Sequence, residues 1–204
     1  MLSIDKIKTR LAAHAPAVLP VDDRVRAAVA LVLRCTERGP EVLFIERALR
    51  TGDPWSGDIG LPGGKVEPSD PDGRAAAERE AVEELGLDLG PATYLGFLGE
   101  IAGATLPVRV GCYVYLLEEV TELDPGDEVT DAFWVALTDL LDPARHGSVS
   151  ITFQGESLPR PSIRLPQTGK PPLWGLTYRL IVELIQLLEP ELQFPKQIRP
   201  TIMA

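Results

Sequence analysis

The chain has 204 residues, enough for one well-buried domain and too few for two domains of ordinary size. Hydrophobic residues make up 45% of it and charged residues 25%, which is typical of a soluble globular protein. The net charge of -10 argues against broad nucleic-acid binding, because such binding needs a basic face. A nucleotide substrate stays possible, since a bound metal ion supplies local positive charge against a phosphate.

Three further features of the composition bear on where the protein acts. Residues 1–20 carry four charged side chains with no long apolar segment after them, unlike a signal peptide. No run approaches the roughly 18 apolar residues that a membrane-spanning helix needs. The two cysteines, Cys35 and Cys112, lie in apolar strand-like runs and are predicted to be buried thiols of a reducing compartment. We expect a soluble, cytoplasmic monomer or homodimer with no membrane or nucleic-acid partner.

The first part of the chain predicts a helix and then a β-hairpin. Residues 3–14 have the spacing of a short amphipathic helix with Ser3 as its N-cap, inside an N-terminal helical extension at 1–24. Two strand-like runs joined by a polar turn predict the hairpin, at 26–35 and 41–48. Residues 50–60 are rich in Gly, Asp and Pro and are expected to form a loop.

The middle of the chain predicts one well-delimited helix and three strands. The helix should begin near Gly73, with Asp72 as N-cap, and end at Gly86, because glycine readily adopts the left-handed conformation that closes helices. The following alternating runs predict strands at 93–101, 108–118 and 128–136, with a short helix at 138–141.

The last part of the chain predicts a small β insertion and a C-terminal helix. Residues 146–172 contain two short alternating runs, at 148–153 and 162–165. The helix is expected at 173–189, with apolar residues dense over 173–188. Strands on either side of a helix, with helices at both ends, indicate a single α/β (α+β) domain over 1–204 in which a mixed sheet is sandwiched between helices.

Three glutamates in the central helix suggest a metal site. Glu80, Glu83 and Glu84 are spaced i, i+3 and i+4, so they lie on one helical face. The same spacing is found in ordinary solvated acidic faces. Like charges at these spacings cost a few tenths of a kcal/mol per pair, whereas a bound Mg²⁺ or Mn²⁺ removes the repulsion. With only two histidines, His-based zinc sites and Ser-His-Asp triads lack partners.

The residues around these glutamates form a longer motif. A double glycine, Gly63-Gly64, precedes the helix, and residues 79–87 read Arg-Glu-Ala-Val-Glu-Glu-Leu-Gly-Leu. This pattern resembles the signature of the Nudix hydrolase family. One departure is that Gly64 stands fifteen residues before Arg79 where the usual spacing is fourteen, which a single inserted residue in the loop at 68–72 explains. Asp70 is then the nearest substitute for a glutamate of the signature.

The resemblance implies a mixed sheet between helices and a metal-dependent hydrolysis of a diphosphate linkage. It implies that Mg²⁺ or Mn²⁺ is held by Glu80, Glu84 and Glu83 and by the backbone carbonyl of Gly63. Arg79 is then expected to bridge the helix carboxylates to the glycine loop rather than bind phosphate. Glu128, six residues before Trp134, matches a later carboxylate of the family, and the general base is left open among Glu83, Glu128 and Glu100.

The sequence at 52–60, together with the loop at 69–72 and the late segment at 173–177, is similar to the coenzyme A pyrophosphatase branch of the family, which also shares the inserted residue. That branch implies cleavage of coenzyme A or acyl-coenzyme A to 3′,5′-ADP and phosphopantetheine or its acyl derivative. The alternatives are another nucleoside diphosphate derivative, such as ADP-ribose or NADH, and a non-catalytic nucleotide-binding module. The branch motif is incomplete here, because Asp53 stands at an arginine position, Leu61 replaces a phenylalanine and residues 44–49 diverge.

A set of residues near the glycines is expected to bind the substrate. Asp53 reverses a charge that would meet a phosphate, and Arg47 or Arg50 could compensate with a bidentate guanidinium. Trp55 could stack on an adenine, although a tryptophan packed on its own domain is the commoner arrangement. The predicted substrate-binding residues are Arg47, Arg50, Trp55, Gly64 and Lys65.

Overall fold

A mixed β-sheet of seven strands runs through the residues that the computed structural model describes, which are 2–53, 55–104, 106–119, 122–153 and 156–194. Its strands are β1 (Val25–Thr36), β2 (Gly39–Arg47), β3 (Ile59–Gly60), β4 (Gly63–Lys65), β5 (Thr93–Ala102), β6 (Val108–Leu117) and β7 (Val129–Ala136). The order is β3-β2-β1-β6-β5, with β4 also paired to β1 and β7 to β2. Only the β1–β6 pair is parallel among these strands.

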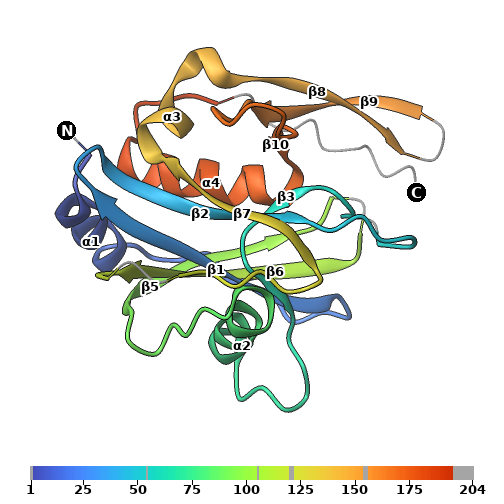
Figure 1. Cartoon of the computed structure of the whole chain (residues 1–204), viewed down its shortest axis with the longest axis horizontal. Helices are drawn as coiled ribbons and strands as arrows, with labels where there is room; N and C mark the ends of the chain where they lie inside the picture. Colours follow the sequence, from blue (N-terminus) through green and yellow to red (C-terminus); the bar gives the residue numbers. More distant parts are fainter. Residues whose placement is uncertain (1, 54, 105, 120–121, 154–155, 195–204) are drawn as a thin grey trace.

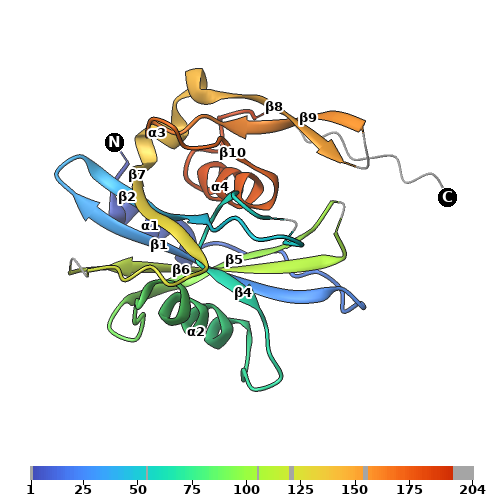
Figure 2. The ribbon, with the colours of Figure 1, turned by 45° about the vertical axis from the view of Figure 1, so that its right-hand side comes forward.

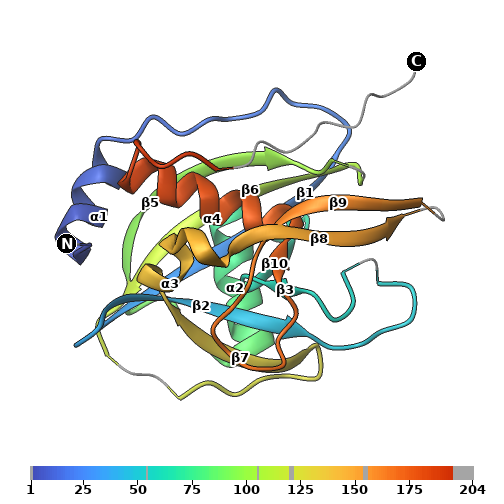
Figure 3. The same cartoon turned by 90° about the horizontal axis from the view of Figure 1, so that it is seen from above.

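Helices flank the main sheet on both faces (Figures 1 and 2). Helix α2 (Gly73–Leu85) covers one face. The other face carries α1 (Ile4–Ala12), α3 (Leu137–Leu141) and α4 (Gly175–Leu188). A three-stranded antiparallel sheet of β8 (His146–Phe153), β9 (Glu156–Ile163) and β10 (Leu173–Trp174) lies alongside α4, as the view from above shows (Figure 3). The expected mixed sheet with flanking helices is confirmed.

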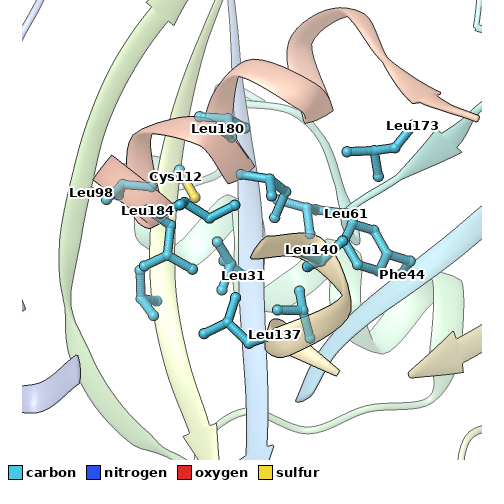
Figure 4. Packing of buried hydrophobic residues seen from close by; sticks show 14 of the residues in the cluster. Leu31, Phe44, Leu61, Leu98, Cys112, Leu137, Leu140, Leu173, Leu180 and Leu184 are labelled. Atoms are coloured by element: carbon cyan, nitrogen blue, oxygen red, sulfur yellow. The ribbon is translucent and has the colours of Figure 1, made fainter. Parts of the chain in front are cut away.

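The sheet separates two apolar cores. The larger core lies between the sheet and α4 and contains Leu31, Phe44, Cys112 and Leu184 (Figure 4). The smaller core lies under α2, where alanines of the helix meet alanines of β1. Small side chains on both elements allow the helix to lie close to the sheet, so the glutamates on its flank are brought near the strands.

Most predicted elements are confirmed with small shifts of their ends. The hairpin of β1 and β2 is present, and the side chain of Ser3 accepts the Lys6 N–H at the start of α1. The expected strand at 162–165 was misplaced, because β9 ends at Ile163. The C-terminal helix starts at Gly175, since Leu173 and Trp174 pair with β9 as a short strand. The described part of the chain has no helix long and apolar enough to cross a membrane.

The prediction for the cysteines is half right. Cys112 is buried in the larger core, and its burial raises the pKa of the thiol. Cys35 is exposed, contrary to the prediction, because it lies near the end of β1, next to the turn that leads into β2. The apolar run in the sequence continues beyond the part of the strand that the core covers.

Candidate active site

Helix α2 is fixed at both ends by its own capping residues. The Asp72 side chain accepts the backbone N–H of Ala75 at 2.8 Å, which satisfies one free donor of the first turn. Gly86 closes the helix with φ of 62°, a conformation that costs a glycine little. Ala81, Leu85 and Glu84 are buried against the sheet, whereas Val82 is 49% exposed. The buried face of the helix therefore includes Glu84.

Glu84 is the most buried charged side chain of the helix. It is only 3% exposed, and its Oε2 accepts the backbone N–H of Gly63 at 2.8 Å. Burial raises the pKa of the Glu84 carboxyl to about 7, although the Gly63 N–H and the Arg47 guanidinium act in the opposite direction. Arg47 Nη1 lies 3.5 Å from Glu84 Oε1. A carboxylate placed in this way has unused capacity for a cation.

Glu80 lies against the glycine turn one helical turn earlier. A Cβ on Gly64 would lie 2.3 Å from Glu80 Oε1, so only glycine leaves room for this carboxylate. Gly63 has φ of 150°, and a Cβ there would lie 2.3 Å from the Ala28 carbonyl oxygen. Burial raises the pKa of Glu80. The absence of side chains at the two glycines therefore allows β4 to pack closely against β1, Glu80 and Glu84.

Arg79 links the helix to the loop that precedes it. Its guanidinium donates to the Lys65 carbonyl at 3.0 Å and to Asp70 at 3.1 Å, and the hydrogen bonding to Asp70 lowers the pKa of that carboxyl. The same group lies 3.1 Å from Glu80 and 2.8 Å from Glu83. Glu83, with 58% of its side chain exposed, is the most solvated of the three helix glutamates. Arg79 thus occupies the bridging position that the resemblance implies.

A cleft of about 850 Å³ opens beside these residues. The predicted metal ligands, Arg79, Glu128 and the predicted substrate-binding residues other than Arg50 all line this cleft. The acidic side comprises the α2 glutamates with Glu67 and Glu128. Apolar side chains of β1, β6, α4 and the loop before β6 line it as well, among them Val25, Val29, Leu106, Val108, Leu176 and Leu180. One cavity therefore presents both carboxylates and an extended apolar surface.

The two candidate arginines have different surroundings. Arg47, near the end of β2, donates from Nη2 to Asp53 Oδ2 at 2.9 Å and also faces Glu84. Arg50 is exposed and donates to Glu128 Oε1 at 2.9 Å, and it is not among the described residues that line the cleft. Asp53 therefore neutralises part of the charge of Arg47 and holds its guanidinium at the cleft.

Glu100, one of the three candidates for the general base, lies elsewhere. Its Oε2 accepts the backbone N–H of Leu19 at 2.9 Å and pairs with the buried guanidinium of Arg109. Arg109 in turn donates to the Leu19 and Pro20 carbonyls. These contacts attach the segment before β1 to the sheet, and Glu100 is not among the described residues that line the cleft.

Two cleft residues were missed by sequence reasoning. Trp174 donates from Nε1 to Asp58 Oδ1 at 2.9 Å, and both side chains line the cleft. Burial raises the pKa of Asp58. The two residues are 116 positions apart. The available signal was that both residues lie in the segments 52–60 and 173–177, which resemble the coenzyme A pyrophosphatase branch, but no site role was assigned to either.

A model of the NUDIX domain matches residues 23–153, which is more than half of the chain. The chain belongs to the Nudix hydrolase family. Members of this family cleave phosphoanhydride bonds and generally use a divalent metal ion, so the protein is an enzyme of that class.

Known Nudix proteins resemble the chain over most of its length. Human mitochondrial coenzyme A diphosphatase NUDT8 is 31% identical over 184 residues, which cover 85% of this chain and 74% of that protein. The uncharacterized Nudix hydrolase NudL of Yersinia pestis is 30% identical over 79% of this chain and 78% of its own. A crystal structure of a MutT/nudix family protein from Enterococcus faecalis has a TM-score of 0.56 at 18% identity, covering 90% of this chain and 68% of that chain, and shows the same fold.

The donor set of this Nudix site suits a divalent cation. Glu80 and Glu84 place two poorly solvated carboxylates beside the glycine turn, and both carry raised pKa values that a nearby positive charge would reverse. Oxygen donors of this kind match Mg²⁺ and Mn²⁺. Among the described residues, no group of three or more His, Cys, Asp or Glu side chains is already gathered as a complete metal cluster. Glu80 and Glu84 are therefore the two poorly solvated carboxylates that this site offers to a cation.

Proposed function

We propose that the protein is a Mg²⁺- or Mn²⁺-dependent pyrophosphohydrolase of coenzyme A or acyl-coenzyme A. Water would be added across the diphosphate linkage, giving 3′,5′-ADP and phosphopantetheine or its acyl derivative. The similarity to human NUDT8, a coenzyme A diphosphatase, supports this substrate. The observation that carries the proposal is the cleft of about 850 Å³, which joins the α2 carboxylates to an apolar surface. A substrate with a diphosphate and a long arm that carries methyl, methylene and acyl groups suits such a cleft.

Each part of the acidic side has a role in this proposal. Glu80 and Glu84 hold the cation together with the Gly63 carbonyl, and Arg79 fixes the glycine turn against them. The cation, when bound, neutralises phosphoryl oxygens and lowers the pKa of a bound water. Proton removal from the attacking water falls to Glu83 or Glu128, because both side chains line the cleft and stay largely solvated.

Four further residues bind the substrate in this proposal. Arg47 faces Glu84 from β2 and offers its guanidinium to the diphosphate. Gly64 and Lys65 form the adjoining wall, and Trp55 provides an aromatic surface. Arg50 was predicted for the same role but does not line the cleft. It donates to Glu128, so we assign it to positioning that carboxylate.

A second substrate class is favoured by one specific observation. Asp53 stands where the coenzyme A branch is expected to have an arginine, and it occupies the guanidinium of Arg47. The positive charge available for the 3′-phosphate of coenzyme A is thereby reduced. ADP-ribose and NADH, which lack that phosphate, are therefore the alternative substrates.

Product analysis by mass spectrometry tests the proposal. Purified protein with Mg²⁺ or Mn²⁺ is incubated separately with coenzyme A, acetyl-coenzyme A, ADP-ribose and NADH, and a chelator serves as the metal-free control. The expected result is 3′,5′-ADP together with phosphopantetheine or its acetyl form. AMP from ADP-ribose or NADH, with coenzyme A intact, would favour the second class. No product from any of them with either metal would contradict both and favour a non-catalytic nucleotide-binding module.

A further inference from the structure

Asp58 has an unused hydrogen-bond acceptor in the cleft. Its Oδ1 accepts from Trp174 Nε1 at 2.9 Å, whereas its Oδ2 accepts no hydrogen bond from any described residue. Nearby Asp53 differs, because its Oδ1 accepts the Trp55 backbone N–H and its Oδ2 accepts from Arg47. Asp58 also forms no salt bridge within the described chain. Of these two aspartates, Asp58 is therefore the one with an oxygen that a ligand can use.

The position of this oxygen is determined by three contacts. The Asp58 backbone N–H donates to the Trp55 carbonyl at 3.1 Å, and the Asp58 carbonyl accepts the Arg47 N–H at 3.0 Å. The Trp174 hydrogen bond fixes the side chain from the start of α4. Because the backbone and the side chain of Asp58 are both fixed by hydrogen bonds, its carboxylate loses little conformational entropy when a ligand donor binds to it. Asp58 is thus preorganised for recognition.

The surroundings favour a planar, neutral group with a hydrogen-bond donor. Trp55 and Trp174 both line the cleft with Asp58, and aromatic side chains can stack on a nucleobase. A carboxylate that forms no salt bridge repels a phosphate but accepts strongly from N–H groups. Adenine has such a donor in its exocyclic amine, whereas hypoxanthine has a carbonyl oxygen at the same place. This difference provides the discriminating contact.

We propose, as a deepening of the function proposed above, that Asp58 is a specificity-determining residue that selects adenine through its exocyclic amine. Trp174 acts as a positioning residue, because it holds the carboxylate through Nε1. A site built to pair with a substrate N–H rejects an analogue that lacks it far better than an apolar pocket does. Selection should therefore be visible in binding rather than in the chemical step.

The test exchanges the acceptor at residue 58 for a donor. In Asp58→Asn the amide oxygen can keep the Trp174 hydrogen bond while the NH₂ group faces the cleft, which suits the carbonyl of hypoxanthine. For wild type, kcat/KM should be at least tenfold higher with coenzyme A than with its hypoxanthine analogue, and the difference should lie in KM. Asp58→Asn should bring this ratio to 1 or below with kcat within about twofold. Asp131→Asn, the same chemical change at a carboxylate paired with Lys170 outside the cleft lining, should keep the wild-type ratio.

A second measurement separates this inference from the proposed function. Tryptophan fluorescence titrations with AMP and IMP need no turnover, and AMP should bind wild type at least tenfold tighter than IMP but not Asp58→Asn. If wild type turns over neither coenzyme A nor its hypoxanthine analogue but still prefers AMP to IMP, only the proposed function is contradicted. Equal affinities in wild type, an unchanged preference in Asp58→Asn, or no measurable binding of either nucleotide would overturn the role of Asp58.

Discussion

Burial determines how Glu84 behaves when no cation is bound. The side chain is almost wholly enclosed, and its closest cation, Arg47, is 3.5 Å away and shared with Asp53. Taking an ionised carboxylate out of water is costly unless it is fully compensated. The fold therefore loses stability at this position, which is common where a residue is kept for function rather than for packing.

The stability of the metal-free protein should depend on pH through Glu84. The pKa of its carboxyl rises from 4.5 to about 7 on folding, so the folded state binds more protons than the unfolded state between these values. Stability should then fall as pH rises from 4.5 to about 7, by an amount on the order of 3 kcal/mol. Urea unfolding at a series of pH values, in the presence of a chelator, measures this change.

Glu84→Gln is the matched variant for the pH measurement. Glutamine keeps the shape and the oxygen that accepts the Gly63 N–H but does not titrate. The free energy of unfolding of the variant should equal that of wild type near pH 4 and exceed it near pH 8. Parallel stability curves for the two proteins across this range would show that burial does not control the ionisation of Glu84.

At the scale of elements, the glycine turn determines how closely β4 and α2 approach. Alanine at Gly64 would meet the end of the flexible Glu80 side chain, whereas alanine at Gly63 would meet the backbone of β1. Gly64→Ala should therefore fold with a melting temperature near that of wild type and lose at least tenfold in kcat, because Glu80 is displaced. Gly63→Ala should lower the melting temperature markedly. The reverse pattern would contradict this assignment of the two glycines.

Local signals predicted the helix that carries the proposed metal ligands Glu80 and Glu84. The capping by Asp72, the stop at Gly86 and the spacing of Glu80 and Glu84 all act within one helix, so the sequence alone indicates them. Strands β3 and β4 have only two and three residues, too few for an alternating pattern, and were not predicted.

Contacts between distant segments lay beyond sequence reasoning. The Asp58–Trp174 hydrogen bond joins the loop before β3 to the start of α4, and neither residue has a local pattern that indicates its partner. The pairing of Arg47 with Asp53 likewise depends on how the loop after β2 folds back. The sequence placed a compensating arginine in this region but left Arg47 and Arg50 equivalent, and their different surroundings separate them.

At the scale of the whole molecule, the cleft is built from both sheets and from helices on both faces of the main sheet. Glutamates come from α2, while Trp174 and the apolar residues of α4 come from the opposite face. A substrate bound in this cleft would therefore contact segments far apart in the chain. A cation held by α2 should stabilise the folded state by mass action.

Thermal unfolding with and without Mn²⁺ tests this linkage. Wild type at pH 8 should gain several degrees in melting temperature with millimolar Mn²⁺, because the cation binds the ionised carboxylates of the folded state. Glu80→Gln and Glu84→Gln should gain much less. Glu78→Gln, on the same helix but hydrogen-bonded to Arg74 and Tyr115, should respond as wild type does. Equal shifts in all four proteins would place the cation elsewhere.

The turnover of Glu84→Gln with saturating Mg²⁺ is the most direct test of the central claim, that the α2 carboxylates in the cleft support metal-dependent diphosphate hydrolysis. Coenzyme A hydrolysis is measured for wild type, Glu84→Gln and the control Glu78→Gln, with circular dichroism to verify the fold. We predict that Glu84→Gln loses at least two orders of magnitude in kcat while the control retains wild-type turnover. Near wild-type turnover of a folded Glu84→Gln protein would contradict the assignment of the metal site.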